Sequence, residues 1–216
     1  MSTTRTCAVL GASAALLLGA SPAMAAHDTN PSAKVESYTY ALGAVQSADV
    51  PNSQGSGTTR VKALPNGKLQ VNVEAWGLAP GLPHAMHLHD NTQGVDFGCP
   101  GPSADADGDG YVDTLEGVPT YGGVVASLTT TGDTSAASAL ALDRFPVADA
   151  SGHLSYERTF TPDAATYAAA GMVQVVVHGI DINDNGVYDF EAGPSSLTPD
   201  APLEATIPAL CGGIAN

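Results

Sequence analysis

A short alternating segment behind a tight turn restricts the fold more than any other feature of this sequence. Apolar residues occupy every second position from Leu69 to Ala75, and Pro65-Asn66-Gly67 lies one residue before them. A period of two predicts a strand with one buried face. The Pro-Asn-Gly turn predicts a hairpin between this strand and residues 60–64.

Similar short segments recur along the chain. We expect further strands near Tyr38 and Tyr40 and at residues 85–89, 124–128, 138–142, 154–160 and 172–178, with a short helix within 162–170. Residues 90–123 form a long loop rich in Gly, Asp and Pro. This spacing predicts an all-β fold, a Greek-key β-barrel or sandwich of about eight antiparallel strands with long metal-binding loops.

The N-terminal residues have the three parts of an export signal. A short basic stretch ends at Arg5, residues 7–20 are apolar, and Ala23-Met24-Ala25 is a small-x-small cleavage site. We therefore expect a signal peptide at 1–25 and a single domain at 26–216, secreted or held in the periplasm or cell envelope. The apolar run is too short to span a bilayer, and Cys7 lies away from the cleavage point, so we expect no membrane anchor. A disordered Ala-rich leader is the alternative.

The charge balance excludes some partners. Seven Lys and Arg face 22 Asp and Glu, for a net charge of −15. This argues against nucleic acids and anionic membranes and favours divalent cations. Removal of the leader would leave Cys99 and Cys211 as an even pair in an oxidising compartment, either bridged or as two unpaired buried thiols.

Two histidines share one face of a predicted strand. Side chains two positions apart on a strand point the same way, so His87 and His89 can chelate one transition metal, and imidazole suits copper and zinc. His84 has the opposite parity, and we expect it to be a structural hydrogen-bonding residue. His178 ends the apolar run 173–177 and is a natural third ligand if that strand lies beside the first. The alternative is that these are surface or satisfied core histidines.

An acidic segment matches the twelve-position calcium loop. Oxygen ligands fall at positions 1, 3, 5, 9 and 12, with glycine at position 6, and the predicted ligands are Asp105, Asp107, Asp109, Tyr111, Asp113 and Glu116. The flanks, 99–104 and 117–123, have no helical pattern, so we expect the loop without the helices of an EF-hand.

A second segment begins in the same way but lacks Glu at position 12, and Glu191 falls one position early. Its predicted calcium ligands are Asp181, Asn183, Asn185, Val187 and Asp189, and an ordinary surface turn is the alternative. Both loops leave from strands that carry the proposed transition-metal ligands. We therefore expect calcium to order the walls of the histidine site.

Several motifs together resemble one known family. Gly77-Leu-Ala-Pro-Gly81, His84-Ala-Met-His87-Leu-His89, Asp90-Asn91-Thr92 with Gly98-Cys99, Val175-Val-Val-His178 and Cys211-Gly-Gly-Ile214 resemble segments of copper/zinc superoxide dismutases, in the same order. The resemblance implies a Greek-key β-barrel, copper at His87, His89 and His178, and a Cys99–Cys211 disulfide. The shorter pattern of His-x-His with a late Val-His also resembles the secreted CHRD domain.

The chain departs from that family at three points. Ser103 and the calcium loop follow Cys99-Pro-Gly-Pro102 where the family has its bridging histidine, and the further zinc histidines are absent, so we expect no zinc site. Residues 203–210 hold no Lys or Arg, whereas the family has an arginine there that draws in superoxide. Two functions remain. One is a copper-dependent superoxide dismutase that lacks the family's bridging histidine and guiding arginine. The other is a non-catalytic secreted module that binds calcium or copper.

Overall fold

The computed structural model describes residues 34–90 and 98–213, so the expected signal peptide lies outside the described residues. Eight strands form the framework: β1 (Glu36–Ala44), β2 (Ser56–Ala63), β3 (Leu69–Trp76), β4 (Met86–Asp90), β5 (Gly123–Ser127), β6 (Leu154–Phe160), β7 (Gln174–His178) and β8 (Pro208–Gly213). The helices are α1 (Thr114–Tyr121), α2 (Ala164–Ala168) and α3 (Leu203–Thr206), with 3₁₀ turns η1 (Pro102–Ala104), η2 (Ala136–Ser138) and η3 (Leu142–Arg144).

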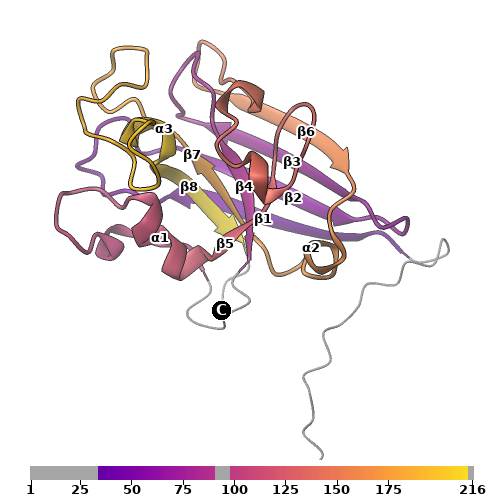
Figure 1. The fold of residues 1–216 in the computed structure, drawn as a ribbon. Coiled ribbons are helices and arrows are strands. Elements are labelled where there is room, and N and C mark those ends of the chain that lie inside the picture. Colours follow the sequence, from indigo (N-terminus) through magenta and orange to yellow (C-terminus); the bar gives the residue numbers. More distant parts are fainter. Residues whose placement is uncertain (1–33, 91–97, 214–216) are drawn as a thin grey trace, which may run out of the picture.

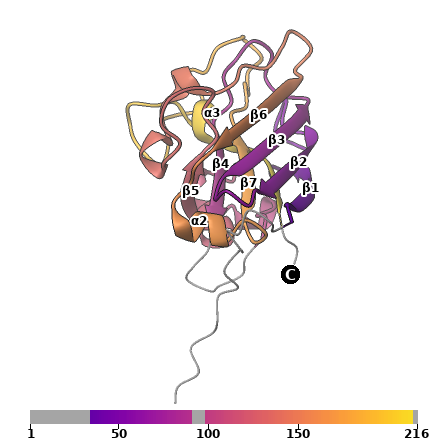
Figure 2. The same ribbon diagram turned by 90° about the vertical axis from the view of Figure 1, so that its right-hand side faces the viewer.

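The strands form one curled antiparallel sheet in the order β5-β4-β7-β8-β1-β2-β3-β6. Its two halves are joined where Gly43 and Ala44 of β1 pair with β8. In Figure 2, β1, β2, β3 and β6 form the near layer, with β4 and β7 behind them. Successive strands β3 and β4 lie in different halves, as in a Greek key. The predicted all-β fold of about eight antiparallel strands is confirmed.

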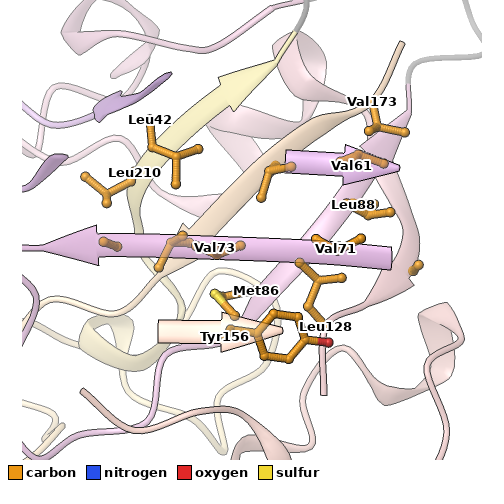
Figure 3. Packing of buried hydrophobic residues seen from close by; sticks show 14 of the residues in the cluster. Leu42, Val61, Val71, Val73, Met86, Leu88, Leu128, Tyr156, Val173 and Leu210 are labelled. Carbon is orange, nitrogen blue, oxygen red and sulfur yellow. The ribbon is translucent and has the colours of Figure 1, made fainter. Parts of the chain in front are cut away.

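The hydrophobic core fills the space between the two halves. Leu69, Val71, Val73 and Ala75 of β3 are fully buried, as the alternation predicted. They belong to one cluster with Met86 and Leu88 of β4 and with residues of β2, β6, β7 and β8. Figure 3 shows Val71, Val73, Met86 and Leu88 side by side in this core.

The opposite face of β4, β7 and β8 is covered by connecting segments. A smaller apolar cluster lies there, formed by Val45, Val112, Tyr121, Val176 and Cys211. Figure 1 shows α1 and α3 beside β7 and β8, away from β3 and β6. This outer face therefore has an enclosed interior of its own, in which the histidines lie. Of the helices in the described part of the chain, none has the length and apolar character needed to cross a bilayer.

Two local predictions were wrong. The strand expected at 138–142 does not form, and this segment runs from the end of the 3₁₀ turn η2 to the start of η3. The Asp133 carboxylate accepts hydrogen bonds from the hydroxyls of Ser135 and Ser138, and such local bonds compete with a sheet ladder. The segment after the first acidic loop was expected to be non-helical, but it forms α1. Asp113 and Glu116 make a reciprocal capping box that starts this helix despite Pro119.

Candidate metal centre

The three predicted transition-metal ligands lie together on the outer face of the sheet. β4 and β7 are antiparallel neighbours, with His87 opposite Val176, and the backbone N–H of His178 donates to Ala85. His87, His89 and His178 are all buried, and one ring nitrogen of each lies within 4.8 Å of the others. The structure thus brings His178 beside two residues that lie 91 and 89 positions earlier in the sequence.

Backbone carbonyls from three different segments fix the orientation of these rings. One nitrogen of each ring donates to a backbone carbonyl oxygen. His87 Nε2 donates to Ala139 at 3.0 Å, His89 Nδ1 to Gly122 at 2.9 Å, and His178 Nδ1 to Thr206 at 2.7 Å. Such bonds set the tautomer of a metal-binding imidazole and increase its basicity. They leave the lone pair of each remaining nitrogen free for another partner.

Those remaining nitrogens have no partner within the protein. In residues 34–90 and 98–213, the buried side-chain nitrogen or oxygen atoms that make no hydrogen bond are His87 Nδ1, His89 Nε2 and His178 Nε2. Buried polar atoms are normally hydrogen-bonded, because each unsatisfied one costs about 1–3 kcal/mol. Three such atoms converging on one point match the donor set of a metal ion.

Burial keeps the three rings in the neutral form that binds metals. It lowers the pKa of His89 from 6.5 to about 3 and the pKa of His178 to about 4. Burial also lowers the pKa of His87 well below 6.5, and the charges of His178 and His89 lower it further. All three imidazoles are therefore unprotonated at neutral pH, and the residues present fit a copper or zinc ion.

The other described histidines lie outside this group. His84 is fully buried, and its ring nitrogens contact the carbonyl oxygens of His178, at 2.9 Å, and Ala79, at 3.2 Å. It supports the backbone of a ligand, in keeping with its predicted structural role. His153 bonds the Glu74 carboxylate at 2.8 Å and stacks on Trp76, on the other half of the sheet.

The first acidic loop closes on itself through its last carboxylate. Glu116 accepts hydrogen bonds from the backbone N–H groups of Ala106, Asp107 and Asp113, so position 12 of the loop reaches positions 2, 3 and 9. Oxygens of Asp105, Asp107 and Glu116 lie within 4.8 Å of one another. Three of the six predicted ligands therefore lie close together, and the use of this loop by calcium stays a prediction.

The second loop obtains an equivalent carboxylate from a distant segment. Glu204 of α3 is fully buried and accepts from the N–H groups of Ile182 and Asp189, which are positions 2 and 9 of this loop. Asp181 accepts from Asn185 and Gly186 at the start of the same loop. Sequence reasoning missed Glu204 because the motif looks for position 12 nearby. The available signal was a lone charge in the otherwise uncharged segment 201–210.

Cys99 and Cys211 form a disulfide, as the resemblance implied. The bond joins Cys99, which lies six residues before the first acidic loop, to β8, across a sequence separation of 112 residues. Cys211 of β8 lies opposite Val176 of β7, and Val176 is two residues before His178. The covalent link thus holds the covering loop against the strands that carry the histidines.

No protein-family model and no curated protein matches this chain. Similar solved structures include Candida albicans superoxide dismutase 5 with Cu(II), at a TM-score of 0.35 and 16% identity, covering 82% of this chain and 91% of that chain. A mutant of the same enzyme has a TM-score of 0.37 and 14% identity, covering 82% of this chain and 90% of that chain. Neither of these two matches is a CHRD domain. At such low values, function has to be argued from the site itself.

Proposed function

We propose that this chain is an exported protein that binds one copper ion through His87, His89 and His178. The observation that carries the proposal is the convergence of three buried ring nitrogens without partners. Among divalent metals, a site of neutral nitrogen ligands binds copper most tightly. A bound copper ion would supply one-electron oxidation and reduction, with a coordination position left for a further ligand.

The chain's own residues have defined roles in this proposal. The three imidazoles hold the ion through His87 Nδ1, His89 Nε2 and His178 Nε2. The carbonyls of Ala139, Gly122 and Thr206 keep the rings in the metal-binding tautomer. Burial lowers the pKa values of the rings, so the nitrogens stay unprotonated at neutral pH when no metal is bound.

Copper stoichiometry tests this proposal. Protein dialysed against copper and then against a weak chelator should retain one copper per chain and show nitrogen hyperfine coupling in its EPR spectrum. His178→Gln should lose this tightly bound copper, because one ligand is removed. His153→Gln is the matched control and should retain it, because His153 lies outside the group. Wild-type protein without copper, or His178→Gln with as much copper as wild type, would refute the proposal.

We also propose calcium sites in both acidic loops, which would order the walls of the copper site. The first would use Asp105, Asp107, Asp109, Tyr111, Asp113 and Glu116, and the second Asp181, Asn183, Asn185, Val187 and Asp189. The coupling between calcium and copper is supported by hydrogen bonds that connect each loop, through one short helix, to one of the proposed copper ligands. Glu116 starts α1, and Gly122, the residue that ends α1, accepts the N–H of His89.

The second loop is linked to the site in a similar way. Glu204 bonds this loop, and Thr206, two residues later in α3, accepts the N–H of His178. Calcium removal should therefore weaken copper binding and lower the melting temperature. A titration with copper in calcium and in a calcium-selective chelator measures both effects. Unchanged copper affinity and melting temperature would refute the coupling.

Superoxide dismutation is the second candidate function. The observation that favours it is a pocket of about 370 Å³ lined by all three histidines, through which a small molecule can reach the site. A net charge of −15 opposes it, because a strongly acidic chain repels an anionic substrate. Superoxide consumption by copper-loaded protein, measured beside His87→Ala and free copper, tests this activity. A rate no higher than that of free copper would exclude it.

Export is supported by the disulfide, since such bonds persist in oxidising compartments. We propose cleavage of residues 1–25, leaving a single domain at 26–216. Mass spectrometry of the protein recovered outside the cytoplasm should give Ala26 as its first residue. An intact N-terminus on the recovered protein would contradict the signal peptide.

A further inference from the structure

The pocket above the histidines is lined mainly by aliphatic side chains. It is lined by His87, His89 and His178, by two threonines, and by alanine, valine and leucine side chains from several segments. The larger aliphatic residues are Val118 of α1, Val124 of β5, Leu140, Leu142 and Leu197. Its volume of about 370 Å³ lies within the range of small-molecule sites.

The polar groups of this lining are already used within the protein. The Thr114 hydroxyl donates to the carbonyl of Thr206 at 2.7 Å, and the Thr206 hydroxyl donates to Ser195 at 2.8 Å. The second nitrogen of each imidazole is bonded to a carbonyl. Apart from the three converging ring nitrogens, the described lining therefore offers a ligand little beyond apolar contact.

The described lining residues include no charged side chain. Arg144, which ends η3 next to the pocket segment, points its guanidinium toward the 131–138 loop, where it donates to Ser138 and to the carbonyls of Thr131 and Asp133. In the metal-free protein, an anion entering the pocket would lose hydration without gaining a countercharge, which is costly in apolar surroundings.

The rim of the pocket is apolar as well. Leu140 and Leu197 come from different connecting segments, and they are 46% and 44% exposed. Large apolar side chains left in water around a concave site are typical of ligand-binding grooves. Both the entrance and the interior therefore favour an uncharged, apolar molecule.

We propose that this pocket binds neutral, apolar small molecules of about one to three rings next to the metal. The proposal deepens the copper-binding function and rests on it for the role of the histidines. The apolar character of the pocket does not depend on the ion, so the two ideas can be tested separately.

The first test uses metal-free protein and the neutral fluorophore N-phenyl-1-naphthylamine. Its fluorescence should rise on binding to wild type. The double variant Leu140→Lys/Leu197→Lys should bind it at least about tenfold more weakly, because two ammonium groups then flank the entrance. The matched control is Val147→Lys/Met172→Lys, at exposed apolar positions outside the pocket, which should bind as wild type does.

Three outcomes of this test would overturn the proposal. The first is equal binding by wild type and the Leu140→Lys/Leu197→Lys variant, and the second is no binding by wild type. The third is a wild-type dimer in sedimentation that dissociates in that variant, which would show that a second copy covers the pocket instead.

The second test compares imidazole with 4-phenylimidazole on copper-loaded protein by the visible absorption of copper. 4-Phenylimidazole should bind at least about tenfold more tightly, because its phenyl ring is removed from water. Leu140→Lys/Leu197→Lys should abolish the advantage of the phenyl ring. Equal affinity of wild type for the two imidazoles would refute the proposal. Wild-type protein that takes up no copper would refute the copper site, while the fluorophore test still decides the pocket.

Discussion

Acidification should destabilise the metal-free protein through the three ligand histidines. In the unfolded chain, histidine has a pKa of about 6.5. In the folded protein, burial lowers the pKa of His89 to about 3 and of His178 to about 4, and the pKa of His87 is also well below 6.5. Between these values the unfolded chain binds more protons than the folded one. The contribution of these histidines to the free energy of unfolding should therefore be fully present well above pH 6.5 and should fall as pH decreases through 6.5 towards the folded pKa values.

The size of this effect follows from the unfolded pKa and the chosen pH. At pH 5, protonating one histidine only in the unfolded state lowers the free energy of unfolding by about 2 kcal/mol. Three such residues give about 6 kcal/mol, which is comparable with the whole stability of a typical domain, about 5–15 kcal/mol. Copper bound to the same nitrogens should oppose the loss, because protons must then compete with the metal.

Urea denaturation at pH 8, 6 and 5, with chelator present and the disulfide intact, measures this fall. His89→Gln removes one of the three titrating groups, so its decrease from pH 8 to 5 should be smaller than that of wild type by about 2 kcal/mol. His153→Gln should behave like wild type. The titrating carboxylates and His84 are common to all these proteins, so their contributions cancel in the comparison. Equal stability of wild type at pH 8 and 5, or an undiminished decrease in His89→Gln, would refute the reasoning.

Three further predictions concern the scaffold. In denaturant titrations, the free energy of unfolding of Cys99→Ser/Cys211→Ser should be lower than that of wild type by up to about 4–5 kcal/mol, because the disulfide constrains the unfolded chain across a separation of 112 residues. Stability equal to that of oxidised wild type would contradict this. Leu88→Ala should lose about 2–5 kcal/mol of stability but retain one copper per folded chain, since Leu88 faces the core; loss of copper from folded protein would be contrary evidence. Glu116→Gln should show a smaller calcium-dependent rise in melting temperature than wild type, whereas Asp200→Asn, at an exposed position outside the loop, should show the full rise. A full rise in Glu116→Gln would argue against the first calcium site.

The strands could be predicted where burial has a period of two. β3 and β6 begin and end where the alternation placed them, because each buries one face against the core. β8 was missed, since Pro208, Gly212 and Gly213 are poor strand formers. Gly212 is nevertheless required there, because a Cβ would overlap the carbonyl oxygen of Ala41 on β1. A close approach between distant segments of this kind leaves no local pattern in the sequence.

The site divides in the same way between local and non-local information. Strand parity was enough to select His87 and His89 and to set His84 aside. His178 could be proposed because it ends a buried strand, but only the pairing of β4 with β7 places it beside the others. The carbonyls that orient the rings and the carboxylate of Glu204 come from connecting segments. Their positions depend on tertiary packing, which no spacing rule describes.

On β4 and β7, core residues lie on one face and the proposed metal ligands on the other. Substitutions at alternate positions of the same strands should therefore affect either stability or metal binding. Met86, Leu88, Val175 and Val177 belong to the core, whereas His87, His89 and His178 face the outer cluster. Randomised libraries at the second set should yield many folded members with altered metal preference. Libraries at the first set should yield few folded members of any kind. We therefore expect that natural or directed evolution can change which metal this face binds while the β-sheet and its core stay the same.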